Sequence, residues 1–224
     1  MYKVYGKASN RGFRILWMLE EIGEPYELIE AGPHDPAVLA VNPSGKVPVL
    51  ETDGAAIPDS TAILTFLADR HGKLTYPAGT IERARQDALT HCILDEIESL
   101  LWIGTRHKFT LPEERRVADL NPSLKWEFDR NIKGLAERFQ GPFLMGDAMT
   151  IADIVLTHNL NWALGAKFPV ESGALLDYSK RMRGGARPSG GSRQWQKAES
   201  LNGPCGAMPA ARVFGTRKKR GVGP

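Results

Sequence analysis

Two short polar segments, each at a change from a strand pattern to a helix pattern, carry residues that could do chemistry. Ser9 and Asn10 precede the first helical run. Asp59 and Ser60 precede a later one, after a second strand pattern. The side-chain oxygens of such residues accept hydrogen bonds from the free N–H groups of a helix N-terminus, so plain capping is the simplest interpretation. The same N-terminus carries about half a positive charge and binds carboxylates and other anions. Both segments are therefore candidate anion sites.

A third feature is the Val47-Pro48 bond, which lies inside the strand pattern of residues 47–52. The cis isomer occurs at about 5–6% of X-Pro bonds in folded proteins. The bond therefore has two interpretations: a cis bend, or a proline that merely begins an edge strand.

The elements that must position these residues follow in the order βαβ and then ββα. Lys3–Tyr5 and Tyr26–Glu30 are predicted strands, and the helix between them ends at Gly23. Asp53-Gly54 is a hairpin signal that joins residues 47–52 to a returning strand at 55–57, and a helix begins at Asp59 or Ser60. This order is the thioredoxin pattern, and we assign residues 1–78 to such a domain.

From about residue 82 onward the pattern is helical. Apolar residues recur at helical spacing, which predicts amphipathic helices over residues 83–107, 124–139, 150–164 and 175–183. Thr150 to Asp153 forms a capping box with Asp in the usual Glu position, so Asp153→Ala is expected to cost about 0.5–2 kcal/mol as a lost cap. The predicted fold class is α/β plus all-α, with a helical bundle domain over residues 82–183.

Composition and cysteine usage exclude several classes of site. Of 224 residues, 42% are hydrophobic and 25% charged, which is typical of a globular protein. Cys92 and Cys205 are the two cysteines, and no C-x-x-C is present, so we expect no disulfide framework, zinc cluster or dithiol redox centre. No apolar run approaches the roughly 20 residues of a membrane span, and the N-terminus lacks a secretory pattern. We therefore expect a cytoplasmic protein that binds no membrane.

The net charge of +3 is concentrated at the C-terminal end. Residues 184–224 contain eight Lys or Arg and one acidic residue, so no basic folded face is indicated and nucleic-acid binding is not expected. Thirteen of these 41 residues are Gly or Pro, and apolar periodicity stops. Such a segment buries too little apolar surface to offset its ordering entropy, which predicts a disordered or atypical tail. A shifted coding frame and a natural extension both remain open as its origin. If the tail is native, a site for a second substrate would be unusually open.

Three segments together resemble one known family. They are Ser9–Glu21 (SNRGFRILWMLEE), Asn42–Leu50 (NPSGKVPVL) followed by Asp59-Ser60, and Gly146–Asp153 (GDAMTIAD). In this order and spacing, over residues 1–183, the chain resembles the cytosolic glutathione transferases, and within them a bacterial, serine-type member. The resemblance implies glutathione as cosubstrate, no metal, a small electrophile as second substrate, and a homodimer formed through the helical domains.

The resemblance also implies how glutathione is held. In the family the proline corresponding to Pro48 is cis, and the exposed N–H and C=O of Val47 pair with the extended peptide as an added strand would. Ser60 and its amide are expected to hold the γ-glutamyl carboxylate, with Asp59 placing the ammonium end. Lys46 is expected near the glycyl carboxylate, a role that His34 could share.

For catalysis, the resemblance places Ser9 at the position of the catalytic serine. A free thiol has a pKa near about 8.5, so it is mostly protonated at neutral pH. A hydroxyl that donates to the thiolate contributes about 1.5–3 kcal/mol, enough to lower the thiol pKa by about one to two units. Asn10 competes for the same sulfur, and Arg11 either orients the thiolate or caps charge at the surface. Tyr5 is another hydroxyl, and its register on the strand predicts a core position.

The second substrate is expected between the two domains, against the long helix, where the candidates by position are Trp102, Arg106, His107 and Phe109. The predicted activity is a detoxifying glutathione transferase. Alternatives on the same scaffold are a glutathione-dependent disulfide reductase, isomerase or dehalogenase, or a non-catalytic protein that binds ligands or partners.

Overall fold

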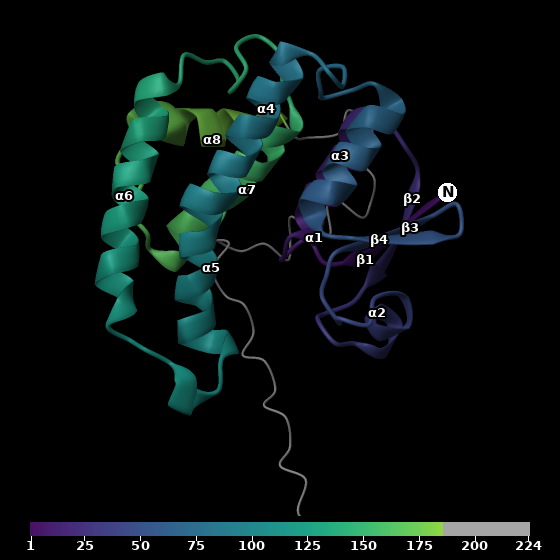
Figure 1. Cartoon of the computed structure of the whole chain (residues 1–224), viewed down its shortest axis with the longest axis horizontal. Helices are drawn as coiled ribbons and strands as arrows, with labels where there is room; N and C mark the ends of the chain where they lie inside the picture. The colour runs from purple at the N-terminus through teal and green to yellow at the C-terminus, as the bar shows by residue number, and fades with distance from the viewer. Residues whose placement is uncertain (186–224) are drawn as a thin grey trace, which may run out of the picture.

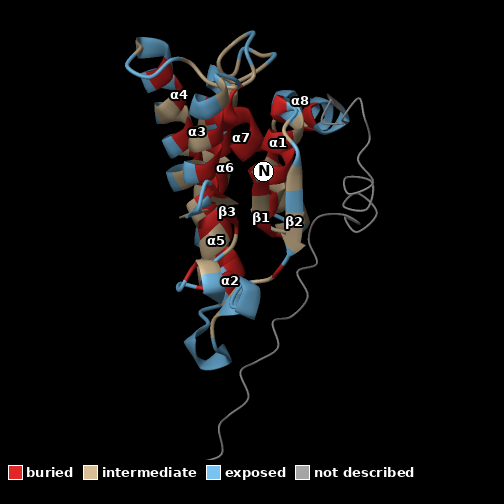
Figure 2. Ribbon diagram, turned by 90° about the vertical axis from the view of Figure 1, so that its right-hand side faces the viewer, coloured by how far each residue is buried: buried red, intermediate tan, exposed pale blue. Residues whose placement is uncertain are grey.

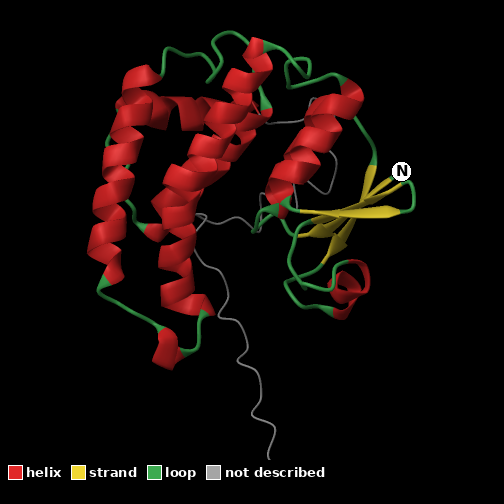
Figure 3. Ribbon diagram, in the orientation of Figure 1, coloured by secondary structure: helices red, strands yellow, loops and turns green. Residues whose placement is uncertain are grey.

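A four-stranded sheet and a set of helices make up the two parts of the protein in this computed structural model, which describes residues 1–185 (Figures 1 and 3). The strand order is β2-β1-β3-β4. β1 and β2 are parallel, whereas β3 is antiparallel to both of its neighbours. The strands are β1 Tyr2–Gly6, β2 Tyr26–Glu30, β3 Val49–Thr52 and β4 Ala55–Pro58. This mixed sheet confirms the predicted thioredoxin-like fold.

Helices cover the sheet on both faces. α1 (Gly12–Ile22) and α3 (Ser60–His71) lie on the face toward the helical part, and α2 (Pro36–Val41) lies on the other face (Figure 1). α1 ends where the sequence predicts, because Gly23 adopts φ 79° and its N–H caps the last turn.

The helical part begins with one long, continuous helical segment over residues 81–110. Its α-helical geometry is interrupted twice by π-helical turns, in the order α4 Ile81–Cys92, π turn Ile93–Glu98, α5 Ser99–Thr105 and π turn Arg106–Thr110. A short 3₁₀ turn (Glu113–Arg115) follows. The remaining helices are α6 Leu120–Arg138, α7 Ile151–Ala166 and α8 Gly173–Gly185.

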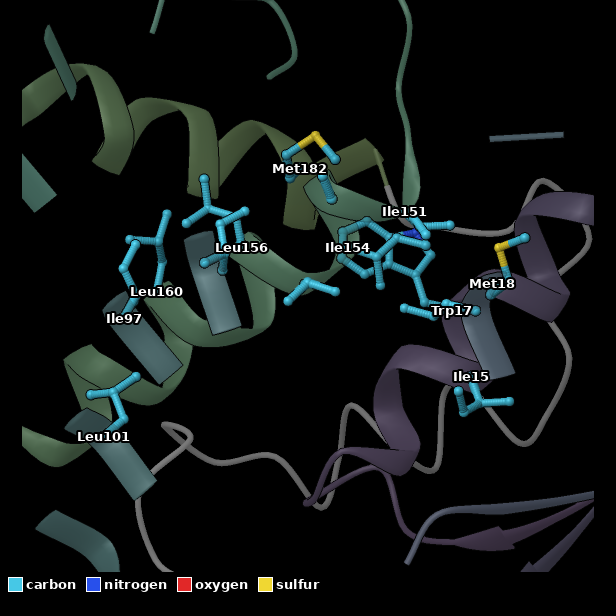
Figure 4. Close-up of a cluster of buried hydrophobic side chains, with 14 of the residues drawn as sticks. Ile15, Trp17, Met18, Ile97, Leu101, Ile151, Ile154, Leu156, Leu160 and Met182 are labelled. Atoms are coloured by element: carbon cyan, nitrogen blue, oxygen red, sulfur yellow. The ribbon is translucent and has the colours of Figure 1, made fainter. Parts of the chain in front are cut away.

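One hydrophobic cluster runs through both parts of the molecule. α1 is buried on nearly every side because the sheet, α3 and α7 surround it, and Figure 2 shows α1 and α7 as largely buried ribbon. Figure 4 shows Trp17 and Met18 of α1 approaching Ile151 and Ile154 of α7, and all four are at most 2% exposed. Each such side chain contributes about 1.5–3 kcal/mol by leaving water. The sheet part and the helical part therefore share a core.

Several predicted element boundaries need correction. The strand predicted over 47–52 begins only at Val49, because Val47-Pro48 forms a bend and proline has no N–H to give to the ladder. The helix predicted over 83–107 runs from 81 to 110 and contains the two π turns. The helix predicted over 175–183 extends to Gly185. The prediction of a disordered tail over 184–224 otherwise lies outside the described residues. Within residues 1–185, no helix is long and apolar enough to cross a membrane.

Candidate glutathione and electrophile site

Three segments that are far apart in the sequence meet at one end of the sheet. Tyr5 of β1 lies opposite Val49 of β3, and Val49 lies opposite Pro58 of β4. The residues just beyond, in the loop after β1, at Pro48 and at Asp59, therefore share this end. A Cβ placed on Gly6 would lie 3.6 Å from Cβ of Pro48, which confirms the close approach. This sheet end brings together the candidate residues for anion and peptide binding.

The Val47-Pro48 peptide bond is cis, as the sequence resemblance implies. Val47 lies outside the strand, and within residues 1–185 its N–H and C=O take part in no hydrogen bond. An extended peptide can pair with such free backbone groups as an added strand.

Asp59 and Ser60 take different positions at the start of α3. Asp59 Oδ1 accepts hydrogen bonds from the N–H groups of Thr61 (2.9 Å) and Ala62 (3.0 Å), so this carboxylate caps the helix. Ser60 is buried, and its Oγ accepts a hydrogen bond from Arg14 Nη1 at 3.1 Å. The hydroxyl proton and the backbone N–H of Ser60 remain available, since no other residue of 1–185 bonds to them. Ser60 is thus better placed than Asp59 to receive a carboxylate.

Ser9 and Asn10 lie in the turn between β1 and α1 and differ in their bonding. Asn10 Oδ1 accepts hydrogen bonds from the N–H groups of Gly12 (2.8 Å) and Lys7 (3.3 Å), so it holds the turn together. Ser9 is exposed, and its hydroxyl has no hydrogen-bond partner among residues 1–185. The alternative interpretation, that Ser9 is an ordinary helix cap, is therefore wrong, and its hydroxyl is free to act on a ligand.

Gly12 is required for this turn, a role that the sequence analysis missed. A Cβ at Gly12 would lie 2.9 Å from both the N and the O of Lys7, closer than real Cβ contacts allow. The loop that carries Ser9 can therefore fold back on α1 only with glycine at this position.

Tyr5, the other nearby hydroxyl, is buried as predicted. Its hydroxyl donates to Glu51 Oε2 at 2.8 Å. Burial, together with the negative charge of Glu51, raises the pKa of Tyr5 to about 12. Tyr5 therefore remains protonated and engaged within the sheet.

Arg11 points away from the sheet end toward the helical part. Its Nε donates to Glu98 Oε1 at 2.5 Å. Its guanidinium carbon lies 5.2 Å from the ring centre of Trp102 on α5 and 5.1 Å from that of Trp162 on α7. The alternative that Arg11 caps charge at the surface is therefore wrong, because its side chain is held at the junction of the two parts.

A buried polar network lies directly behind Arg11. Arg14 is 0% exposed. Its Nη2 donates to Glu98 Oε2 (2.5 Å) and to Asn159 Oδ1 (3.1 Å), and it lies 3.1 Å from His158 Nδ1. Since Arg14 also donates a hydrogen bond to Ser60, the network connects the start of α3 to the helical part. The sequence signal was an arginine within the apolar run of α1.

Charges in this network are strongly coupled. Burial alone would raise the pKa of Glu98, but Arg14 and Arg11 hold it down at about 2. Burial, with the positive charge of Arg14, holds the pKa of His158 well below its usual value. At neutral pH the network therefore contains two positive guanidinium groups, one carboxylate and a neutral imidazole.

The remaining candidates for holding glutathione surround the Asn42–Val47 loop. Lys46 is exposed, and its C=O accepts a hydrogen bond from Asn42 Nδ2 at 2.9 Å. His34 is exposed too, and its N–H donates to the C=O of Gly45 at 2.7 Å. A Cβ at Gly45 would lie 2.2 Å from His34 Nδ1, so the imidazole packs directly on this glycine. The structure thus brings His34 and Lys46 to the same loop.

The four predicted residues for the second substrate do not form one group. Trp102 stacks on Arg11 at the junction. His107 Nδ1 accepts a hydrogen bond from the N–H of Val117. Phe109 is 42% exposed and carries Lys108 over its ring at 4.9 Å, and Arg106 is exposed as well. Of the four, the structure places only Trp102 in contact with Arg11.

Aromatic residues that the sequence analysis missed complete the junction. Trp162 lies 6.5 Å from Trp102, between ring centres, in an edge-to-face arrangement. Phe13 stacks on His158 at 6.1 Å. Because these residues come from α1, α5 and α7, their proximity depends on tertiary packing. Among residues 1–185, no group of three or more His, Cys, Asp or Glu side chains could hold a metal ion.

Comparison with known proteins gives consistent matches. The sequence model of the family described as "Glutathione S-transferase, N-terminal domain" matches residues 8–70. A glutathione S-transferase of Pseudomonas putida is 30% identical over 172 residues, which cover 73% of this chain and 75% of the relative. Maleylacetoacetate isomerase of Rhizobium meliloti is 34% identical over 102 residues, 43% of this chain and about half (48%) of that enzyme.

A solved structure supports the fold. The theta class glutathione S-transferase of Xanthomonas axonopodis pv. citri, solved with glutathione bound, superposes with a TM-score of 0.66 at 24% identity. The match covers 81% of this chain and 92% of that one.

Proposed function

The chain belongs to the glutathione S-transferase family, and on this basis we propose that it binds glutathione at the sheet end and activates the thiol for attack on a small electrophile. The observation that carries this proposal is the convergence of three uncommitted groups at one end of the sheet. They are the backbone of Val47, the amide and hydroxyl proton of Ser60, and the hydroxyl of Ser9. Each matches one part of an extended tripeptide with a carboxylate at one end and a thiol in the middle.

Binding uses the backbone and the start of α3. Val47 pairs with the cysteinyl unit of glutathione through its N–H and C=O. The γ-glutamyl carboxylate meets Ser60, where the N-terminus of α3 adds its positive dipole. Asp59 caps the helix with Oδ1 and takes the ammonium end with its other carboxylate oxygen, and Lys46, with His34 beside it, takes the glycyl carboxylate.

Catalysis stabilises the thiolate. The thiol proton leaves to solvent, and the Ser9 hydroxyl donates a hydrogen bond to the anionic sulfur. The sulfur then forms a bond to the electrophilic carbon with its lone pair. In a substitution the leaving group departs with the electrons of the broken bond, and in an addition the resulting carbanion takes a proton from water. Asn10 maintains the turn that presents Ser9, and Arg11 lies on the electrophile side.

The test compares the wild type with Ser9→Ala, and with Ser123→Ala as a matched control on the exposed face of α6. Glutathione affinity is measured by calorimetry, and the thiol pKa by thiolate ultraviolet absorbance in each complex. We expect Ser9→Ala to raise the pKa of bound glutathione by about one to two units. An unchanged pKa would remove Ser9 from the mechanism. Absence of glutathione binding in the wild type would refute the whole proposal.

Glutathione-dependent isomerisation is a second candidate, favoured by the 34% identity to a maleylacetoacetate isomerase. The same thiolate would add to a conjugated double bond, permit rotation and leave again, so glutathione would not be consumed. Measuring loss of free thiol during turnover separates the two reactions, because a transferase consumes one thiol for each product.

We further propose that the protein is a cytoplasmic homodimer, joined through its helical part, and that it detoxifies small electrophiles. Sedimentation velocity tests the dimer directly. A single species with the mass of one chain would contradict it.

A further inference from the structure

Arg11 is fixed in place by three neighbours. Glu98 holds Nε at 2.5 Å, and the rings of Trp102 and Trp162 each lie about 5 Å from the guanidinium carbon. We call Arg11 and these three residues the Arg11 cage. A guanidinium held on several sides loses little side-chain freedom when it binds a further group.

The cage leaves hydrogen-bond donors free. A guanidinium has five N–H donors, and within residues 1–185 Arg11 uses only the one on Nε. Its side chain is 27% exposed, and neither Nη group is among the buried, unpartnered atoms of residues 1–185, so both groups are accessible. They form the planar fork that matches a carboxylate in two parallel hydrogen bonds.

The charge around the cage favours an anion. Glu98 is shared between Arg11 and Arg14, so its single negative charge is opposed by two guanidinium groups. The His158 imidazole beside Arg14 is neutral, because burial and Arg14 lower its pKa. Within this hydrogen-bonded network, two positive charges therefore meet one negative charge, and Asp59 is a further carboxylate whose charge acts on Arg14.

The walls of the cage favour a planar molecule. Trp102 and Trp162 are both half-buried, and each presents aromatic surface at the junction between the sheet part and the helical part. Flat conjugated systems bind such surfaces by stacked or edge-to-face contacts. Arg11 follows Ser9 by two residues, so their Cα atoms are at most about 7 Å apart. Ser9 and Arg11 therefore belong to one short segment, with Ser9 toward the sheet end and the Arg11 side chain toward the helical part.

We infer that the Arg11 cage selects electrophiles in which a planar conjugated system carries a carboxylate, with the carboxylate on the Nη groups of Arg11 and the conjugated system against Trp102 and Trp162. This inference rests on the proposed function. It names the class of second substrate and makes Arg11 the residue that discriminates acids from neutral analogues.

The experiment uses one aromatic ring with and without the charge. 4-Chloro-3,5-dinitrobenzoate and its methyl ester both undergo substitution of chloride by glutathione, and each enzymatic kcat/KM is divided by the rate constant of the uncatalysed reaction. We expect the wild type to favour the acid by about 10-fold or more. Arg11→Gln should lower kcat/KM for the acid by about 10- to 100-fold and that for the ester by less than about 3-fold. Arg115→Gln, at an exposed arginine outside the cage, should change neither.

A binding measurement covers the case in which turnover is slow. Quenching of tryptophan fluorescence gives the affinity for the glutathione conjugates of the acid and of the ester. The wild type should bind the acid conjugate about 10-fold more tightly, and Arg11→Gln should remove this difference.

The outcomes separate the two proposals. Equal normalised rates and equal conjugate affinities for acid and ester in the wild type overturn the inference. An equal loss for both in Arg11→Gln also overturns it, as does a weakened affinity for glutathione itself, which would assign Arg11 to glutathione. A wild type that binds no glutathione refutes the proposed function instead.

Discussion

Removing the charge of Glu98 tests whether the buried network holds the two parts of the molecule together. In Glu98→Gln the side chain keeps its shape, but Arg14 loses the only carboxylate that forms an ion pair with it among residues 1–185, while remaining 0% exposed. The other contacts of Arg14, with Ser60, Asn159 and His158, are to neutral groups. Breaking a buried ion pair on one side costs about 3–5 kcal/mol, because a buried charge is left uncompensated.

The pKa of Glu98 gives an independent magnitude. It lies at about 2 in the folded protein, against an ordinary value of about 4.3 for glutamate, a difference of roughly 3 kcal/mol. Because the folded pKa is lowered, this stabilisation is fully present above about pH 4.3 and is lost as the pH falls toward about 2. The difference in free energy of unfolding between the wild type and Glu98→Gln should therefore shrink by about 2 kcal/mol as the pH falls from 6 to 3.

The assay is equilibrium urea unfolding of both proteins at several pH values, followed by tryptophan fluorescence and circular dichroism. Glu137→Gln, which changes an exposed glutamate of α6, is the matched control and should stay within about 0.5 kcal/mol of the wild type. Adding Arg14→Met to Glu98→Gln removes the unpaired charge and should recover part of the loss. The reasoning is wrong if Glu98→Gln lowers the free energy of unfolding by less than about 1 kcal/mol at pH 6. It is also wrong if the plots of this free energy against pH stay parallel for the wild type and Glu98→Gln down to pH 3.

Two further substitutions test the scaffold of the site. Asp153→Ala should lower the free energy of unfolding by more than the about 1 kcal/mol of a lost cap, because the Tyr178 hydroxyl also loses its 2.9 Å hydrogen bond to Oδ1 and keeps only the 3.3 Å one to the backbone C=O of residue 153. Tyr178→Phe should cost less in the same urea titration. A cost for Asp153→Ala no larger than that of Tyr178→Phe would contradict this. Gly12→Ala should cost about 1–3 kcal/mol and weaken glutathione binding measured by calorimetry, because the new Cβ meets the backbone of Lys7 at 2.9 Å. Gly134→Ala, where no atom lies within 4 Å of the new Cβ, should instead stabilise α6 by about 0.5–1 kcal/mol, and similar effects of the two alanines would refute the steric argument.

The arrangement of the sheet was predictable because its signals are local. The strand Tyr26–Glu30 and the end of α1 at Gly23 occur where alternation and a glycine stop predict them. The meeting of Val47-Pro48 with the start of α3 then follows from the order of the strands and the hairpin between them. The role of each residue at this end depends on the bound ligand, which no local sequence pattern specifies.

The junction was not predictable from local patterns. Arg14 and Glu98 are 84 positions apart, and no periodicity relates an arginine in an apolar helix to a particular carboxylate. Trp162 and His158 were overlooked because they occur in a strongly apolar helix, where aromatic side chains usually signal core. The π turns depend on a shift of backbone hydrogen bonds from i−4 to i−5, which packing decides and side-chain spacing does not reveal.

The π turn at Ile93–Glu98 also determines how the long helix tolerates insertions and deletions. A π turn accommodates one residue more than the same stretch of regular α-helix, and each residue of an α-helix rotates the chain by about 100°. Deleting a single residue there removes that extra residue, so the stretch returns to regular α-helix and the residues beyond it keep their face. A deletion within α4 has no such extra residue to absorb it, and it turns everything beyond it by about 100°, which takes Trp102 away from Arg11. This one turn therefore lets the long helix lose a residue without changing the face that Trp102 presents to Arg11.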